Sequence, residues 1–255
     1  MATIDILLAG MSVNTDQSNL GLATIALIRG RNNILVDVAH CGRRRHLINA
    51  LASRGLTPDD IQIVVLTHAH WDHSQNVDMF PHARFMIHPA ELEYAKSPRK
   101  DDWATPRYFP ATLQGLNVQP VVEGTEIEPG VRIIETPGHT RGHISVAVDT
   151  PDGVAVIAGD SFPDAGAVHR GQPYLVFWSQ RDARASVQKI MKLGNIIYPG
   201  HDRPFRIASD GSTTYVGGVA TIKVIAGFEP NDVGVGVTVS LESIKEAWVH
   251  PEAQG

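Results

Sequence analysis

The amino-acid sequence predicts an α/β fold, and three observations lead to this prediction. Short apolar segments with strand character alternate with segments whose apolar residues recur at helical spacing. The chain has 255 residues, of which 43% are hydrophobic and 19% charged, so it can bury one large core. Its histidine- and aspartate-bearing motifs each follow the end of an apolar strand, where α/β proteins usually place their sites.

The first half of the chain reads as strands with helices between them. Strands are expected at 4–9, 22–28, 33–38, 61–66 and 83–88, and helices at 43–55 and 89–95. The segment 61–66, IQIVVL, is apolar throughout, which is typical of a strand buried on both faces. Residues 96–117 are polar and proline-rich and carry three aromatic side chains, which predicts a long loop or insertion.

The second half returns to the same alternation. Strands are expected at 130–136, 144–149, 154–159 and 195–200, and a helix at 181–194 that ends on a glycine. Residues 208–255 are rich in glycine and valine and suggest a hairpin, with a short helix near LESIKEAW. We therefore expect residues 1–207 to form the main domain and residues 208–255 an extension packed on it. A homo-oligomer contact or the cover of a sheet edge is a hypothesis for its role.

The composition limits the cellular compartments and the classes of binding partner that we expect. A formal net charge of -5 gives no general reason to expect nucleic acid as a partner. Cys41 is the single cysteine, so no intrachain disulfide can form and a reducing compartment is expected. The first ten residues read as a strand and not as a signal peptide, and no segment has the roughly 18 apolar residues of a membrane span. These features predict a cytoplasmic protein without a membrane segment.

The stretch LTHAHWDHSQN (66–76) concentrates three histidines and an aspartate in six positions. His68 and His70 alternate in an extended segment, so both rings can point the same way, and Asp72 and His73 then turn toward a second position. The motifs ETPGHTRGHIS, IAGDSF and YPGHDRPF add His139, Asp160 and His201. Seven nitrogen and oxygen ligands suit two divalent ions about 3.5–4 Å apart that share a carboxylate.

These motifs resemble those of the metallo-β-lactamase superfamily, whose HxHxDH signature stands here at residues 68–73. The resemblance covers roughly residues 4–207 and implies a four-layer αββα sandwich with two metal ions at one edge of the sheets. It implies that His68, His70 and His139 hold one ion, that Asp72, His73 and His201 hold the other, and that Asp160 bridges them. Zinc is the expected metal, although iron or manganese could occupy the same ligands.

Differences between this sequence and the motifs of particular subgroups exclude some branches of the superfamily. Asp160 stands where one group of true β-lactamases has a cysteine ligand, and His70 stands where flavodiiron proteins usually carry glutamate. The group that remains has HxHxDH together with a bridging aspartate, and it includes glyoxalase II-like thioesterases, lactonases, organophosphate hydrolases and transfer-RNA nucleases. Many quorum-quenching lactonases have a tyrosine where this chain has Pro163. The stretches VAVIAGDSF and IIYPGHDRPFRI also resemble a small member of the superfamily linked to RNA cleavage.

Three functions follow from this resemblance. The first is hydrolysis of a small ester, lactone, thioester or amide by a metal-bridging hydroxide, with Asp72 orienting the hydroxide and carrying a proton. The alternative is a metal-dependent phosphodiesterase or ribonuclease, and the second alternative is a non-catalytic metal-binding protein. A basic cleft leading to the metals would favour the phosphodiesterase, and an apolar, aromatic cleft the small-molecule hydrolase.

Further residues are expected to support the ligands or to shape a pocket. Asp37, which ends the strand ILVD, is expected to hydrogen-bond a ligand imidazole, and His143 to lie beneath the site as a structural group. Aromatic residues of two loops could wall a substrate pocket, or alternatively pin those loops to the core; these residues are Trp103, Tyr108, Phe109, Tyr174, Phe177 and Trp178.

Overall fold

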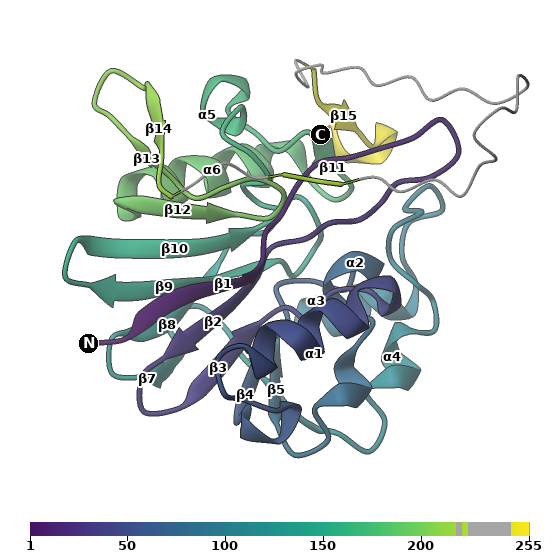
Figure 1. The fold of residues 1–255 in the computed structure, drawn as a ribbon. Coiled ribbons are helices and arrows are strands. Elements are labelled where there is room, and N and C mark those ends of the chain that lie inside the picture. The colour runs from purple at the N-terminus through teal and green to yellow at the C-terminus, as the bar shows by residue number, and fades with distance from the viewer. Residues whose placement is uncertain (218–220, 224–245, 255) are drawn as a thin grey trace, which may run out of the picture.

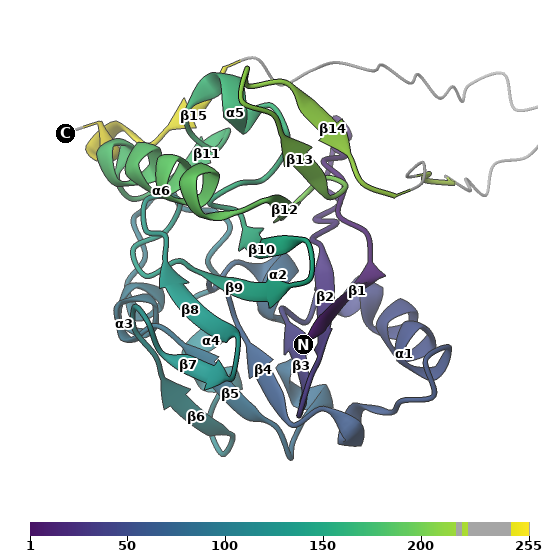
Figure 2. The same ribbon diagram turned by 90° about the vertical axis from the view of Figure 1, so that its left-hand side faces the viewer.

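The computed structural model describes residues 1–217, 221–223 and 246–254. Two β-sheets lie face to face, and helices cover their outer faces (Figure 1). A turn of the molecule by 90° shows α6 on the outer side of the second sheet and α1 beside the first (Figure 2). None of the helices in the described ranges combines the length and hydrophobicity that a bilayer crossing needs.

The first sheet has six strands that follow one another in chain order. The first three strands pair antiparallel, and the remaining strands continue in parallel from the third. The strands are β1 (Thr3–Leu8), β2 (Ile25–Arg29), β3 (Asn33–Val36), β4 (Ile63–Val65), β5 (Arg84–Ile87) and β6 (Asn117–Pro120).

The second sheet has seven strands in the order β14-β13-β12-β10-β9-β8-β7. Only β10 and β12 pair in parallel, and the other neighbours are antiparallel. The strands are β7 (Glu126–Glu128), β8 (Val131–Glu135), β9 (Ile144–Thr150), β10 (Gly153–Gly159), β12 (Ile196–Pro199), β13 (Phe205–Ile207) and β14 (Thr213–Tyr215). A separate parallel pair joins β11 (Leu175–Val176) to β15 (Trp248–Val249).

The helices are short apart from α1, α3 and α6. They are α1 (Arg44–Ala52), α2 (Trp71–Ser74), α3 (Pro89–Lys96), α4 (Phe109–Thr112), α5 (Ala167–Arg170) and α6 (Gln180–Leu193). Four 3₁₀ turns complete the described elements: η1 (Cys41–Arg43), η2 (Pro58–Asp60), η3 (Val77–Met79) and η4 (Pro251–Ala253).

Three apolar clusters fill the spaces between the four layers. Along β2, Ile25 and Leu27 face the cluster under α1 and α3, whereas Ala26 and Ile28 face the cluster between the sheets. The third cluster joins the second sheet to α6, where Ile190 packs on it. Side chains that alternate between two buried faces require a layer on each side. The predicted four-layer αββα sandwich is therefore confirmed.

Some sequence expectations differ from the structure in their details. The loop at 96–117 contains the short helix α4, which was not predicted because the segment is polar and rich in proline. The expected strand at 22–28 begins only at Ile25, because Thr24 bonds to the backbone of the second sheet at Pro199 and Gly200. The hairpin expected in 208–255 begins earlier, because β13 ends at Ile207 and only β14 lies in that range. Of the helix expected near LESIKEAW, residues 241–245 lie outside the described residues, and Trp248 at its end belongs to the strand β15.

Candidate metal centre

The candidate ligands come from loops at one edge of the two sheets. His68 and His70 follow β4, His139 lies between β8 and β9, Asp160 follows β10 and His201 follows β12. These loops must approach closely: a Cβ atom at Gly200 would lie 2.0 Å from the Asp160 carboxylate. Only glycine fits at that position, so the sequence YPGH brings β12 against the end of β10.

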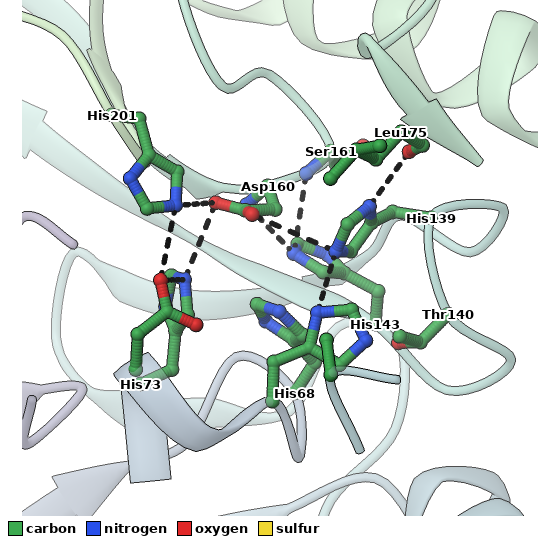
Figure 3. Close-up of polar contacts among 12 residues, drawn as sticks. His68, His73, His139, Thr140, His143, Asp160, Ser161, Leu175 and His201 are labelled. Atoms are coloured by element: carbon green, nitrogen blue, oxygen red, sulfur yellow. Dashed lines mark hydrogen bonds and ion pairs between the residues drawn. The ribbon is translucent and has the colours of Figure 1, made fainter. Parts of the chain in front are cut away.

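The seven predicted ligands form two adjoining groups. His68, His70, His139 and Asp160 offer atoms that all lie within 4.8 Å of one another, and Asp72, His73 and His201 do the same. Every one of these residues is buried, with at most 8% of its surface exposed. The structure thus brings the seven residues together at one place. Figure 3 labels five of them, His68, His73, His139, Asp160 and His201.

Asp160 lies between the two groups, with one carboxylate oxygen toward each. Its Oδ1 is 3.2 Å from Nε2 of His201 and 3.3 Å from Nε2 of His73. Its Oδ2 is 3.6 Å from Nε2 of His139. This placement is the one that a carboxylate shared by two ions requires.

Several inward atoms of this site contact only the other candidate ligands and make no hydrogen bond within the described part of the chain. Nε2 of His68, Nε2 of His73 and Oδ1 of Asp160 are buried without a hydrogen bond among the described residues. Such unpaired polar groups are costly to bury. Their convergence on one point, and the nitrogen and oxygen donor set, fit divalent metal ions of the zinc type.

Hydrogen bonds from behind fix two of the imidazoles on the HxHxDH loop. Nδ1 of His73 donates to Asp37 at 2.7 Å, and Asp37 also accepts from the backbone and hydroxyl of Thr67. Because the Thr67 hydroxyl proton is given to Asp37, Nδ1 of His68 donates to its oxygen at 2.9 Å. Both rings therefore keep the Nε2 lone pair for the site. Asp37 lies in the place that the sequence analysis expected.

Backbone carbonyls fix two further rings. Nδ1 of His139 donates to the carbonyl of Leu175 at 2.8 Å, and Nδ1 of His201 donates to that of Leu22 at 3.1 Å. No side-chain pattern reveals these partners, since any residue has a carbonyl.

His143 lies beneath the site, and both of its ring nitrogens contact other groups of the protein. Its Nε2 accepts from the backbone N–H groups of Asp160 and Ser161 at 3.1 and 3.2 Å, and its Nδ1 contacts the hydroxyl of Thr136 (Figure 3). Burial holds the pKa of His143 well below its usual range, so the ring is neutral. It supports the Asp160 loop and leaves no nitrogen for a metal.

Charge within the site favours ligation. Burial, reinforced by nearby His70, lowers the pKa of His139 to about 4, and burial with neighbouring His73 holds the pKa of His68 well below its usual range. Burial alone would raise the pKa of Asp160, yet His201 and His73 hold it well below its usual range. Burial alone would lower the pKa of His73 and His201, yet the carboxylates of Asp72 and Asp160 raise both above the usual range. Metal binding therefore meets neutral rings at His68 and His139 and an ionised Asp160, and it displaces a proton from His73 and from His201.

Glu91 is a supporting residue that the sequence analysis missed. This carboxylate in the first turn of α3 is fully buried and accepts from the backbone of Ala69, the hydroxyl of Thr140 and the backbone of Gly142. Burial raises its pKa above the usual range. It joins the loop of His68 and His70 to the loop of His139. In the sequence it reads only as a polar residue of the short helix PAELEYA.

A cavity of about 470 Å³ opens over the two ligand groups. Trp71, Trp103 and Tyr174 line it, together with Asp72 and polar side chains of the loop between β1 and β2. The lining contains no lysine or arginine among the residues that the structure describes.

Three of the aromatic residues predicted for the pocket lie elsewhere. Phe109 is buried in the core under α4, Tyr108 accepts a hydrogen bond from Gln75 outside the cavity, and Trp178 packs beneath Arg99. These positions agree with the alternative expectation, in which the aromatic residues fasten their loops. Phe177 does not line the cavity either, but its ring packs edge-on against His70 and His139, with centroids 5.0 and 5.5 Å apart.

Residues 17–201 match the family model described as the metallo-beta-lactamase superfamily. The chain therefore belongs to the metallo-beta-lactamase superfamily. Metallo-beta-lactamase domain-containing protein 1 of Xenopus laevis is 34% identical over 190 residues, which are 74% of this chain and 74% of that protein. It is the small member that VAVIAGDSF and IIYPGHDRPFRI resemble, so that prediction is confirmed. The matches to the mouse, rat and human proteins of the same name span 62–65% of their length.

Lactonases are also among the similar proteins. An N-acyl homoserine lactonase of Bacillus sp is 28% identical over 162 residues, 61% of this chain and 62% of that protein. AiiA of B. thuringiensis, solved as a variant with N-decanoyl-L-homoserine at its active site, has a TM-score of 0.62 and 21% identity. That alignment covers 78% of this chain and 92% of the AiiA chain, and it supports the fold.

Proposed function

We propose that this protein is a dinuclear, zinc-dependent hydrolase that opens a small, uncharged ester, lactone, thioester or amide. The observation that carries the proposal is the cavity over the seven converging ligands, which is large enough for a small molecule and lined without a lysine or arginine side chain in the described ranges. Members of the superfamily are mostly metal-dependent hydrolases, and one relative is named an N-acyl homoserine lactonase.

Each of the two groups of candidate ligands described above would hold one metal ion. His68, His70 and His139 would hold one ion, Asp72, His73 and His201 the other, and Asp160 both. Two divalent ions at such a site would lower the pKa of a bound water to about 7 and would polarise a carbonyl oxygen.

Asp72 would serve the reaction as well as the metal. Its carboxylate lines the cavity and its Oδ2 lies 3.4 Å from Nε2 of His201. It is therefore placed to accept a proton from the attacking water and to pass it to the leaving group. Trp71 and Trp103 would exclude water from one side of the substrate, while the hydroxyl of Tyr174 adds a donor at the cavity wall.

The lining favours a neutral substrate over a phosphodiester. Binding of a nucleic-acid backbone depends on lysine and arginine contacts to phosphates. The ionised groups that line this cavity are the carboxylates Asp72 and Asp160, apart from histidines. A polyanionic strand would gain its charge stabilisation from the metal ions alone.

The test compares substrates in parallel. Zinc-reconstituted protein is assayed with an N-acyl homoserine lactone, a thioester and bis-p-nitrophenyl phosphate, each with and without a chelator. Asp160→Ala should abolish activity, while His82→Ala, which changes a surface histidine paired with Asp59, should leave it unchanged. Chelator-sensitive cleavage of a carbonyl substrate is the expected result. Cleavage of the phosphodiester alone would favour the nuclease, and no turnover of any substrate would favour a non-catalytic metal-binding protein.

A further inference from the structure

His70 is turned differently from the other candidate ligand histidines. In those four rings Nδ1 carries a proton and donates it to an oxygen behind the site, which leaves Nε2 for the metal. In His70 it is Nδ1 that faces the site, 3.0 Å from Nε2 of His139. Its Nε2 points away from the site and is buried without a hydrogen bond among the described residues.

The ion-pair partner that the structure gives to this nitrogen is Asp102. Oδ1 of Asp102 lies 3.6 Å from Nε2 of His70, and its side chain is completely buried. The residue belongs to the inserted loop at 96–117, where nothing in the sequence distinguishes it from Asp101 beside it. Asp101, in contrast, is largely exposed.

Asp102 is held rigidly by the loop around it. Its Oδ1 accepts from the backbone N–H groups of Ala104 and Thr105, both at 2.9 Å. Its Oδ2 accepts from the hydroxyls of Tyr94 and Thr105, both at 2.7 Å. The loop is in turn fastened to the HxHxDH segment, because the N–H of Trp71 donates to the carbonyl of Ala104 at 3.0 Å. The carboxylate therefore has a fixed position relative to His70.

We propose that Asp102 is the positioning residue of His70: it accepts the Nε2 proton and so directs the Nδ1 lone pair at the metal. This inference rests on the metal site of the proposed function. The 3.6 Å separation is longer than the 2.7–3.2 Å of a direct N–H···O bond, and a shift of about 0.5–1 Å in the ring closes it. A carboxylate behind a ligand imidazole fixes its tautomer and increases its basicity. With Asp102 included, all five ligand histidines have an acceptor behind them.

A purely structural role must be distinguished, since Asp102 also ties its own loop together. Asp102→Asn keeps an oxygen for the two backbone donors and removes the charge that faces His70. Tyr94→Phe does the reverse: it removes one bond of the loop and keeps the carboxylate. Asp101→Asn removes a neighbouring charge and is the matched control.

The first measurement is zinc affinity, by competition with a chromophoric chelator, together with thermal unfolding of the metal-free proteins. We expect Asp102→Asn to weaken one bound zinc ion by about 10- to 100-fold. Tyr94→Phe should lower the unfolding temperature without changing zinc affinity more than about 2-fold, and Asp101→Asn should change neither. Equal affinity in Asp102→Asn and the wild type would overturn the proposal, as would an equal loss in Tyr94→Phe.

The second measurement needs no variant to fold. In zinc-loaded wild type, ¹⁵N–¹H spectra of the histidine rings should show His70 protonated at Nε2 and the other four ligand rings protonated at Nδ1. A proton on Nδ1 of His70 would contradict the inference. If the wild type binds no zinc at all, the proposed metal site itself fails, whereas zinc binding with an unaffected Asp102→Asn refutes only the role of Asp102.

Discussion

Replacing Asp37 by asparagine should disable one metal ligand without touching the ligand itself. The Asp37 side chain is 2% exposed and accepts from Nδ1 of His73 and from both the backbone and the hydroxyl of Thr67. Asparagine preserves the size of the side chain and tolerates the left-handed backbone at this residue, where φ is 61°. It replaces one accepting oxygen by a donating NH₂ group.

Either orientation of that amide leaves a conflict. With NH₂ toward His73, two donors meet unless the ring gives up its Nδ1 proton, which places the proton on Nε2 and removes the lone pair from the site. With NH₂ toward Thr67, the backbone N–H loses its acceptor. Loss of a hydrogen bond to a charged group costs about 1.5–3 kcal/mol. We therefore expect the free energy of unfolding of the metal-free protein to fall by that amount, and zinc affinity by about 10- to 100-fold.

Urea unfolding in the presence of a chelator measures the first quantity, and chelator competition the second. Asp149→Asn, which breaks the surface ion pair with Arg132, is the control and should cost less than about 1 kcal/mol. An Asp37→Asn protein with the wild-type unfolding midpoint and wild-type zinc affinity would refute the reasoning that this carboxylate sets the tautomer of His73.

Three further predictions concern other parts of the site. Glu91→Gln places an amide group among three hydrogen-bond donors, so the free energy of unfolding, measured in urea, should fall by about 1–3 kcal/mol. Glu93→Gln, on the exposed face of the same helix, is the control and should lower it by less than about 1 kcal/mol. The folded pKa of His139 is lowered to about 4, so its contribution to metal-free stability is present above pH 6.5 and is lost as the pH falls toward 4. His139→Gln should remove about 2–3 kcal/mol of that pH dependence in unfolding curves recorded between pH 4 and 7, and an unchanged slope would contradict the assigned cause. Trp103→Ala should raise KM several-fold with little change in kcat, while Trp178→Ala, outside the cavity, should leave KM unchanged; equal effects of the two would place the substrate elsewhere.

The ligand loops could be predicted because each one follows a buried strand. The apolar segment before His68 can only be a central strand, and the glycine or proline turns before His139 and His201 end others. Parallel and antiparallel strands of stacked sheets bring such turns to a common edge. The pattern of residues thus carries the geometry of the site.

The supporting residues could not be predicted in the same way. Glu91 and Asp102 lie in polar surroundings along the chain and become buried only when α3 and the inserted loop fold over the HxHxDH segment. The backbone carbonyls of Leu22 and Leu175, which accept from His201 and His139, cannot be predicted from side-chain patterns because every residue has a carbonyl. For Phe109 the sequence left a pocket wall and a core position both open, because the short helix that directs the ring into the core has no clear signal in this polar loop.

The short pair of β11 and β15 extends the folding unit beyond the ligand motifs. Figure 1 shows the two strands side by side. The N–H groups of Trp248 and His250 donate to the carbonyls of Tyr174 and Val176, while the carbonyl between them, that of Leu175, accepts from Nδ1 of His139. A fragment that stops at residue 207 would contain every candidate ligand and still lack the strand that keeps this carbonyl in place. The residues that supply the candidate ligands and the residues that hold them in place therefore have different C-terminal limits, and a truncation before Trp248 removes the strand that pairs with the segment behind His139.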